Sequence, residues 1–435
     1  MIKAGFAECV ISPEVGQEMP GIFQKRFGQS IHDDLLATAL VLDDGAAPVA
    51  IVGVDTLSVK RSIVRDARER IAARTGIPAG HVMIAASHTH NGGPVADAFM
   101  SEADPAYCGM VAERIADAVA AAWARRESSR LVIGTGSAAG VAFNRRFVMR
   151  DGSVRTHPGK GNPDIVRPAG PVDPAVGVIG AFSSEDGRFL GAFVNFACHC
   201  TLDVGGPGFS ADYPLYMRQL IREGLETPEA VVVFGNGACG DITQVDNQAQ
   251  GDREFGEAWG RLVGTAVAAE ALKILMRPAN GSAEMPLACR STLLELRPRA
   301  LDAAVVAESR RMLATHEGDT WTSDEVWARE FVLLDEMLRD EPQVEAEVQM
   351  LRVGPAALVS VPCEYFCQFG LDIKASSPCD PTFVVELANG CVGYVPDAQA
   401  VLDQSGYEPR TARSSKLAPE AGAHLAAAAV ELLRR

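Results

Sequence analysis

The sequence MIAASHTHNGGP, residues 83–94, joins the end of an apolar run to two closely spaced histidines. The run has the composition of a buried β-strand. Side chains at positions i and i+2 of a strand point to the same face, so we expect His88 and His90 to share a face where the strand ends. The carboxyl ends of strands form the ligand-binding edge of open α/β sheets. The pair therefore indicates a metal or catalytic site, and the simpler alternative is two surface histidines at a strand end.

The sequence around this stretch alternates between strand and helix signals. Residues 36–55 hold two β-rich runs, whereas residues 61–75 and 105–126 have helical spacing. This rhythm predicts an α/β fold with mixed β-sheets and flanking helices, in which at least part of the sheet is parallel.

Two later segments differ from this pattern. Residues 146–175 are rich in Gly, Pro and charge, which predicts a long irregular loop of the kind that is functional or mobile. Residues 251–340 are predicted to be a largely helical insertion, and an Ala-rich helix is expected over 419–434. No repeat or linker divides the chain, so we expect a single large catalytic domain over residues 1–435.

Composition limits the class of protein. The chain has 40 basic and 56 acidic side chains, a net charge of −16, and no basic run, which argues against nucleic acid as a partner. The first residues lack a signal-peptide core, and no apolar run approaches the roughly 20 residues of a membrane span. Ten cysteines without a short-chain disulfide framework are typical of reduced thiols. We expect a cytoplasmic protein that acts on a small molecule away from membranes, and we leave homo-oligomer formation open.

A second histidine motif follows another apolar strand. His199 lies in NFACHC, residues 195–200, before a Gly-rich turn. Strand alternation directs Cys198 and Cys200 to the face opposite His199, so one metal cannot easily use all three. We expect both cysteines to be small core residues.

Three further polar residues follow apolar runs. They are Asp241 in FGNGACGDITQ, Glu364 in VSVPCEYF and Tyr394 in a Gly-Tyr-Val-Pro turn. Each has an ordinary structural alternative: a helix-capping aspartate, an acid in a first helical turn, and a packed tyrosine.

Taken in order, these segments resemble the amidase domain of the neutral (non-lysosomal) ceramidases, zinc enzymes that hydrolyse the amide of N-acylsphingosine. ASHTHNGGP is similar to the family's Ser-His-Thr-His-x-Gly-Pro motif, and NFACHCT to its Phe-Ala-x-His strand end. GACGDITQ, SVPCEYF and LANGCVGYV are similar to its Asn-x-Gly-Asp, Pro-Gly-Glu-Phe and Leu-x-Asn-x-Tyr-x-x-Tyr motifs. The resemblance spans about residues 5–410.

The resemblance implies one Zn²⁺ per chain. The implied ligands are His88, His199, Glu364 and Tyr394. His90 is then placed beside the metal, where it stabilises the tetrahedral intermediate or protonates the leaving amine, and His88 and Tyr394 belong to the catalytic set as ligands. Zinc takes imidazole and carboxylate donors and keeps a position open for water in catalytic sites. The implied reaction is metal-assisted amide hydrolysis.

The sequence also departs from the family. Asn144 and Arg145 match its Asn-Arg-Ser-Pro motif, but Arg146 replaces the serine, which favours a polar or anionic substrate. We expect Asn144 and Arg145 to bind substrate, Arg146 to clamp a carboxylate, and His32 to line the pocket; the alternative for both arginines is a solvated loop charge. The family's C-terminal β-sandwich domain is not expected here, and ceramide itself is a poor fit as substrate.

The leading hypothesis is thus a zinc hydrolase that cleaves the amide bond of a small polar substrate. An esterase or lactonase would use the same chemistry, and a non-catalytic metal-binding relative would keep only the site. A two-metal phosphate-ester hydrolase would need extra ligands, for which Asp241 and Asp55 are the candidates.

Overall fold

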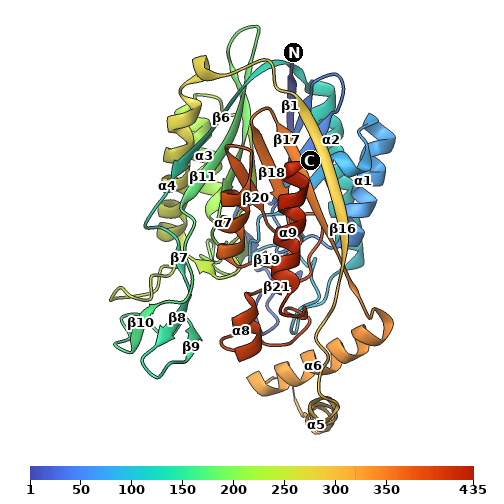
Figure 1. Cartoon of the computed structure of the whole chain (residues 1–435), viewed down its shortest axis with the longest axis vertical. Helices are drawn as coiled ribbons and strands as arrows, with labels where there is room; N and C mark the ends of the chain where they lie inside the picture. The colour runs from blue at the N-terminus through green and yellow to red at the C-terminus, as the bar shows by residue number, and fades with distance from the viewer. Residues whose placement is uncertain (319) are drawn as a thin grey trace.

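An eight-stranded mixed sheet forms the centre of the computed structural model, which describes residues 1–318 and 320–435 (Figure 1). The strand order is β14-β12-β11-β6-β1-β3-β4-β5. The strands are β1 (Lys3–Val10), β3 (Leu36–Asp43), β4 (Val49–Val54), β5 (Val82–Ala86), β6 (Glu127–Ser137), β11 (Ala175–Ser183), β12 (Phe189–Phe196) and β14 (Val231–Asn236). The edge pairs β4–β5 and β12–β14 are parallel, and the other neighbours are antiparallel. The predicted α/β fold with a partly parallel sheet is confirmed.

The large sheet bends into two halves that face each other. The halves are joined where β1 pairs briefly with β6, and β4 of one half approaches β14 of the other. A Cβ on Gly53 would lie 2.4 Å from the carbonyl oxygen of Phe234, so this close approach requires glycine. Helices α1 (Arg61–Thr75) and α2 (Pro105–Arg125) cover one half, and α3 (Tyr213–Gly224) and α4 (Glu257–Leu275) cover the other (Figure 1).

A second sheet lies between these halves and the C-terminal helix. Its strands, in the order β16-β17-β18-β20, are β16 (Leu287–Leu296), β17 (Val344–Val353), β18 (Ala356–Ser360) and β20 (Thr382–Val385). Helices α7 (Cys367–Ser376) and α9 (Ala421–Arg434) pack against it, and α9 confirms the predicted Ala-rich helix. Apolar residues of this sheet and of both halves of the large sheet share one core.

The smaller elements connect these layers. They are β2 (Ser30–Ile31), β7 (Phe143–Asn144), β13 (Gly208–Phe209), β15 (Ile242–Thr243), β19 (Glu364–Tyr365), β21 (Tyr394–Val395), α8 (Ala398–Asp403) and the 3-10 turns η1 (Ala79–His81) and η2 (Pro278–Asn280). Within the described ranges, no helix combines the length and the apolar character needed to cross a bilayer.

The prediction of an irregular loop over residues 146–175 is wrong. The segment contains a three-stranded sheet in the order β10-β8-β9, formed by β8 (Arg146–Met149), β9 (Val154–Thr156) and β10 (Ile165–Pro168). Strands this short give little periodic signal, and the turn between β8 and β9 needs Gly152 at φ 81°. The high content of Gly and charged residues therefore predicts a loop where the chain forms a small sheet.

The segment 251–340 contains more than helices. The predicted helices are present as α4, α5 (Ala303–Ala314) and α6 (Ser323–Asp340). Between α4 and α5, however, β16 pairs with β17 from Leu287↔Val353 to Leu296↔Val344. β16 is an edge strand with half-exposed faces, so its sequence lacks the clear apolar alternation of a buried strand. The limits of the insertion and of the single domain stay predictions.

The carboxyl ends of five strands converge on one region. These are β5, β12, β14, β18 and β20, from both sheets. The segments that follow them contain His88 and His90, His199, Asp241, Glu364 and Tyr394. The topology therefore gathers residues that are far apart in the sequence.

Candidate metal centre and its cavity

Five polar side chains meet at this convergence. Oε2 of Glu364 lies 3.3 Å from Nε2 of His88 and 3.4 Å from Nε2 of His199. Nε2 of His90 lies 3.4 Å from that of His88, and the Tyr394 hydroxyl lies 3.4 Å from Nε2 of His199. One ligand atom from each of the three histidines fits within a 4.8 Å span. The residues that the sequence placed at a metal site are therefore adjacent in space.

The backbone conformation that positions His88 differs from the predicted strand. β5 ends at Ala86, and His88 has a left-handed backbone with φ 67°, so strand alternation does not direct its side chain. Its amide donates to the Thr56 carbonyl at 3.0 Å, and its Nδ1 lies 2.8 Å from the Leu57 carbonyl oxygen. Because a carbonyl only accepts, Nδ1 bears the proton and Nε2 presents a lone pair to the cluster.

His90 and His199 are held by neighbouring loops. The amide of His90 donates to the carbonyl of Cys200 at 3.1 Å, and that of His199 donates to Ile242 at 3.2 Å. A side chain at Gly21 would lie 2.6 Å from Nδ1 of His90, so this glycine admits the imidazole. β12 ends at Phe196, and Cys198 and Cys200 are buried in the core as predicted, although not through strand alternation.

Glu364 and Tyr394 are register partners in the parallel pair β19–β21. Glu364 is 9% exposed, and its Oε2 is buried without a hydrogen bond. A buried carboxylate oxygen that accepts no hydrogen bond is costly, and such an atom calls for a specific explanation. Here it faces imidazole nitrogens, a donor set that zinc accepts.

The electrostatics of the cluster also suit a cation. Burial raises the pKa of the Glu364 carboxyl, but His88 and His199 outweigh this, so the pKa lies well below its ordinary value. Burial, with Arg145 and His88, lowers the pKa of His199 to about 3. Burial and the other two imidazoles hold the pKa of His90 well below its usual range. Ionised carboxylate and neutral imidazole are the forms that bind metals.

His88 behaves differently. Burial lowers its pKa, but the Glu364 carboxylate more than compensates, so the net pKa of His88 is raised. A proton and a cation would therefore compete for the same lone pair of Nε2, which faces the Glu364 carboxylate at 3.3 Å. These residues fit a zinc ion by donor type and by charge.

A cavity of about 610 Å³ opens beside the cluster. Its walls include three of the predicted residues: His90, Arg145 and Tyr394. Asn144, Arg146 and His32 do not line it. Of the four predicted substrate-binding residues, only Arg145 therefore lines this cavity.

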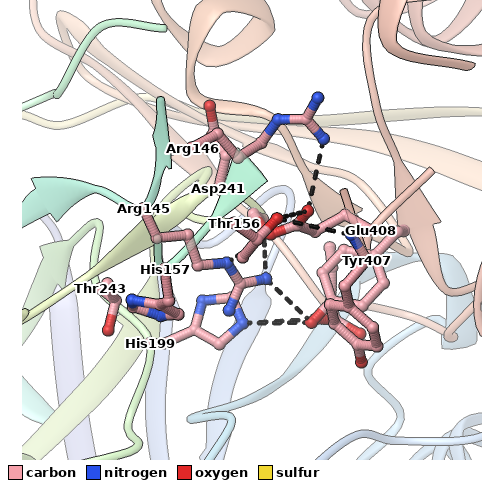
Figure 2. Close-up of polar contacts among 12 residues, drawn as sticks. Arg145, Arg146, Thr156, His157, His199, Asp241, Thr243, Tyr407 and Glu408 are labelled. Carbon is pink, nitrogen blue, oxygen red and sulfur yellow. Dashed lines mark hydrogen bonds and ion pairs between the residues drawn. The ribbon is translucent and has the colours of Figure 1, made fainter. Parts of the chain in front are cut away.

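Arg145 and Arg146 share a buried carboxylate, Glu408 (Figure 2). Arg145 donates to Glu408 at 2.7 Å and to the Tyr394 hydroxyl at 3.1 Å. Arg146 donates to the other oxygen of Glu408 at 3.3 Å and lies over the ring of Phe366. Arg146 is therefore occupied by an internal ion pair, whereas Arg145 reaches the cavity. No motif in the sequence marks Glu408.

The remaining predicted residues have other partners. Asn144 donates to Oδ2 of Asp241 at 2.7 Å, and Oδ1 of Asp241 accepts the Cys367 amide at 2.8 Å. Asp241 therefore accepts the backbone amide of the first residue of α7. His32 lies between Asp33 at 2.8 Å and Glu257 at 3.1 Å.

A second metal near Asp241 gains no support. Asp55 forms a two-pronged ion pair with Arg218, with distances of 2.6 and 2.9 Å. The oxygens of both aspartates are thus occupied by protein donors. Neither belongs to the histidine cluster found among the described residues.

Part of the cavity wall is aromatic, and the sequence does not predict it. Phe23, Phe99 and Tyr407 line the cavity, and Phe23 lies 4.7 Å from Phe99 between ring centroids. Trp327 of α6 packs behind them, 5.7 Å from Phe23 and 5.8 Å from Phe99. These residues come from four distant segments, so no local pattern reveals the wall.

Comparison with solved structures places this geometry in a known fold. Over its full length the chain superposes on the neutral ceramidase from Pseudomonas aeruginosa with a TM-score of 0.75, covering 75% of that chain at 19% identity. The fold is ceramidase-like. A ceramidase complexed with C2 gives a TM-score of 0.74 at 18% identity, again with 100% of this chain and 75% of the other. No family model matches the chain, and comparison with curated proteins gives no match. The ceramidase-like fold confirms the fold predicted from the resemblance.

Proposed function

We propose that this protein is a zinc-dependent hydrolase that cleaves the amide C–N bond of a small polar substrate. The observation that supports the proposal most directly is Oε2 of Glu364. It is buried without a hydrogen bond and lies within 3.4 Å of Nε2 of both His88 and His199. The ceramidase-like fold supports the amide class, because two solved structures that share this fold are ceramidases.

The residues that would hold zinc are His88, His199, Glu364 and Tyr394. When bound there, zinc supplies Lewis-acid polarisation of the scissile carbonyl and lowers the pKa of a water molecule. Burial and the Glu364 carboxylate raise the pKa of the Tyr394 phenol well above its ordinary value, and Arg145, which donates to its hydroxyl at 3.1 Å, acts in the opposite direction. The Glu364 carboxylate supplies a further negative charge for the cation.

Two residues would act on the substrate from the cavity wall. His90 faces the cluster with Nε2, where a neutral imidazole accepts a proton from water and returns it to the leaving amine. The Arg145 guanidinium lines the same cavity and is placed to bind a substrate oxygen. Its ion pair with Glu408 fixes its orientation.

Metal analysis of the purified protein tests the proposal. We expect about one zinc per chain and, in His88→Ala, loss of both zinc and amide hydrolysis, since removing one of four ligands weakens binding strongly. His424→Ala is the matched control, because His424 is exposed on α9. Full zinc content in His88→Ala would contradict the assigned site. Paired amide and ester analogues of one substrate show whether the C–N bond is the preferred target.

A further inference from the structure

The cavity beside the cluster is rich in positive charge. Three guanidinium groups line it, those of Arg26, Arg145 and Arg253. Among its described lining residues, Asp203 is the one carboxylate. The whole chain has a net charge of −16, so the charge of the cavity lining is opposite in sign to the net charge of the protein.

Two of these guanidinium groups already have anionic partners. Arg145 is paired with Glu408 at 2.7 Å. Arg26 lies 3.5 Å from Asp203 and donates to the backbone carbonyl of His90, so it also holds the His90 loop. The guanidinium groups of these two arginines therefore already have partners within the protein.

Arg253 differs from both. Its side chain is exposed at the cavity, and within the described chain no carboxylate lies at ion-pair distance from it. The positive charges of Arg145 and Arg253 both reach His157, where burial first and then these charges lower the imidazole pKa to about 4. Arg253 thus lies near the same imidazole as Arg145, yet among the residues that the structure describes its guanidinium has no hydrogen-bond or ion-pair partner.

The rest of the lining is apolar and aromatic. Phe23, Phe99 and Tyr407 form the aromatic wall, and Phe255 lies two residues from Arg253. A ligand that satisfies this cavity combines an apolar or aromatic group with one oxyanion. Guanidinium binds carboxylate through parallel N–H donors, which makes a carboxylate a suitable oxyanion.

We propose that Arg253 determines specificity by binding a carboxylate of the substrate, so that the preferred substrates are acylated amines with a free carboxylate and an apolar side group, such as N-acyl amino acids. This inference rests on the proposed amide hydrolysis for its substrate class. It assigns the predicted contact with a substrate carboxylate to Arg253 in place of Arg146, whose guanidinium is paired with Glu408.

The test compares two substrates that differ only in charge, N-acetylphenylalanine and its C-terminal carboxamide. We expect kcat/KM for hydrolysis of the N-acetyl group to be about tenfold higher for the carboxylate, as a charge-assisted contact at a partly exposed site allows. Arg253→Gln should bring the ratio of the two values close to one, and Arg253→Lys should keep part of it. Arg65→Gln, an exposed arginine on α1 away from the cavity, should keep the full ratio. Added salt should lower the preference, since it screens exposed charges.

Binding of N-acetylphenylalanine to the protein, measured by calorimetry, separates the two proposals. If binding weakens in Arg253→Gln but neither compound is hydrolysed, the carboxylate contact stands and the proposed reaction fails. If both compounds are hydrolysed equally well by the native protein, the reaction stands and the carboxylate contact is overturned. An unchanged ratio in Arg253→Gln also overturns it.

Discussion

The thiol of Cys239 lies 3.4 Å from Nδ1 of His199, on the side of the imidazole away from the cluster. The same thiol donates to the buried carboxyl of Glu386 at 2.9 Å. Since the thiol proton goes to Glu386, the sulfur is free to accept the Nδ1 proton of His199. This contact leaves Nε2 unprotonated toward the candidate metal position, as the Leu57 carbonyl does for His88.

Replacing Cys239 should therefore weaken zinc binding without removing a ligand. We expect Cys239→Ala to lower zinc affinity by about 10- to 100-fold, the usual effect of losing a group that orients a metal-bound histidine. Cys239→Ser should restore part of the affinity, because a hydroxyl also accepts. Competition with a chromophoric chelator measures the affinity, and Cys379→Ala is a control at another buried cysteine outside the cluster. Equal affinity in Cys239→Ala and the control would show that the thiol does not orient His199.

The Glu408 carboxylate should be important for stability. It is fully buried between Arg145 and Arg146, so Glu408→Gln would leave two guanidinium groups without their shared counter-charge. We expect a loss of about 3–5 kcal/mol in the free energy of unfolding, measured by urea denaturation. Glu431→Gln, which removes an exposed partner of Arg435, should change it by less than about 1 kcal/mol. Similar urea midpoints for the two variants would count against this role.

His157 should make the protein acid-sensitive. Burial, followed by the charge of Arg145, lowers its pKa from 6.5 to about 4, so the folded protein binds fewer protons than the unfolded chain between these values. Protonation therefore favours unfolding, and stability is lost as the pH falls from about 6.5 towards 4. His157→Asn should reduce the loss between pH 7 and pH 5 by about 2 kcal/mol.

Asparagine suits this test because His157 has φ 46°, a conformation that Asn adopts readily. Urea denaturation at the two pH values measures the difference, and His81→Asn provides a comparison at a histidine outside the cavity. If the native protein and His157→Asn lose stability equally on acidification, another group is responsible.

Trp327 should link α6 to substrate binding. It is buried behind Phe23 and Phe99, which line the cavity. We expect Trp327→Ala to destabilise the fold by about 3 kcal/mol and to raise KM for an aromatic substrate more than it lowers kcat, because the wall loses support while the histidine cluster is untouched. Trp259→Ala on α4 is the control at a more exposed tryptophan, 37% accessible. An unchanged KM in Trp327→Ala would show that the wall does not depend on α6.

Much of the fold was predictable because its signals are local. Apolar periodicity marked α1, α2, α6 and α9, and continuous apolar runs marked the buried strands that precede the histidines. β16 and the β8–β10 sheet were missed because edge strands and short hairpins bury too little to show a period. Their pairing depends on distant partners, which a local pattern does not contain.

The candidate site was predictable only where a motif contains its chemistry. The His-Thr-His sequence led to the cluster even though the backbone of His88 is left-handed and the alternation argument does not apply. The carboxylate partner of Arg146, Glu408, is 262 positions away in the sequence, so no local pattern shows that this guanidinium is already paired. Tyr407, Arg253 and Cys239 gave no signal, since their significance comes from their neighbours in the fold.

The register pairing of Glu364 with Tyr394 has a consequence for biosynthesis. β19 and β21 run parallel, so their pairing requires the whole connection through α7 and β20 to be synthesised and folded first. A growing chain on the ribosome exposes His88 and His199 long before Tyr394 emerges. We therefore expect the complete donor set to form as one of the last events of folding. Zinc binding would then indicate that the chain is fully folded.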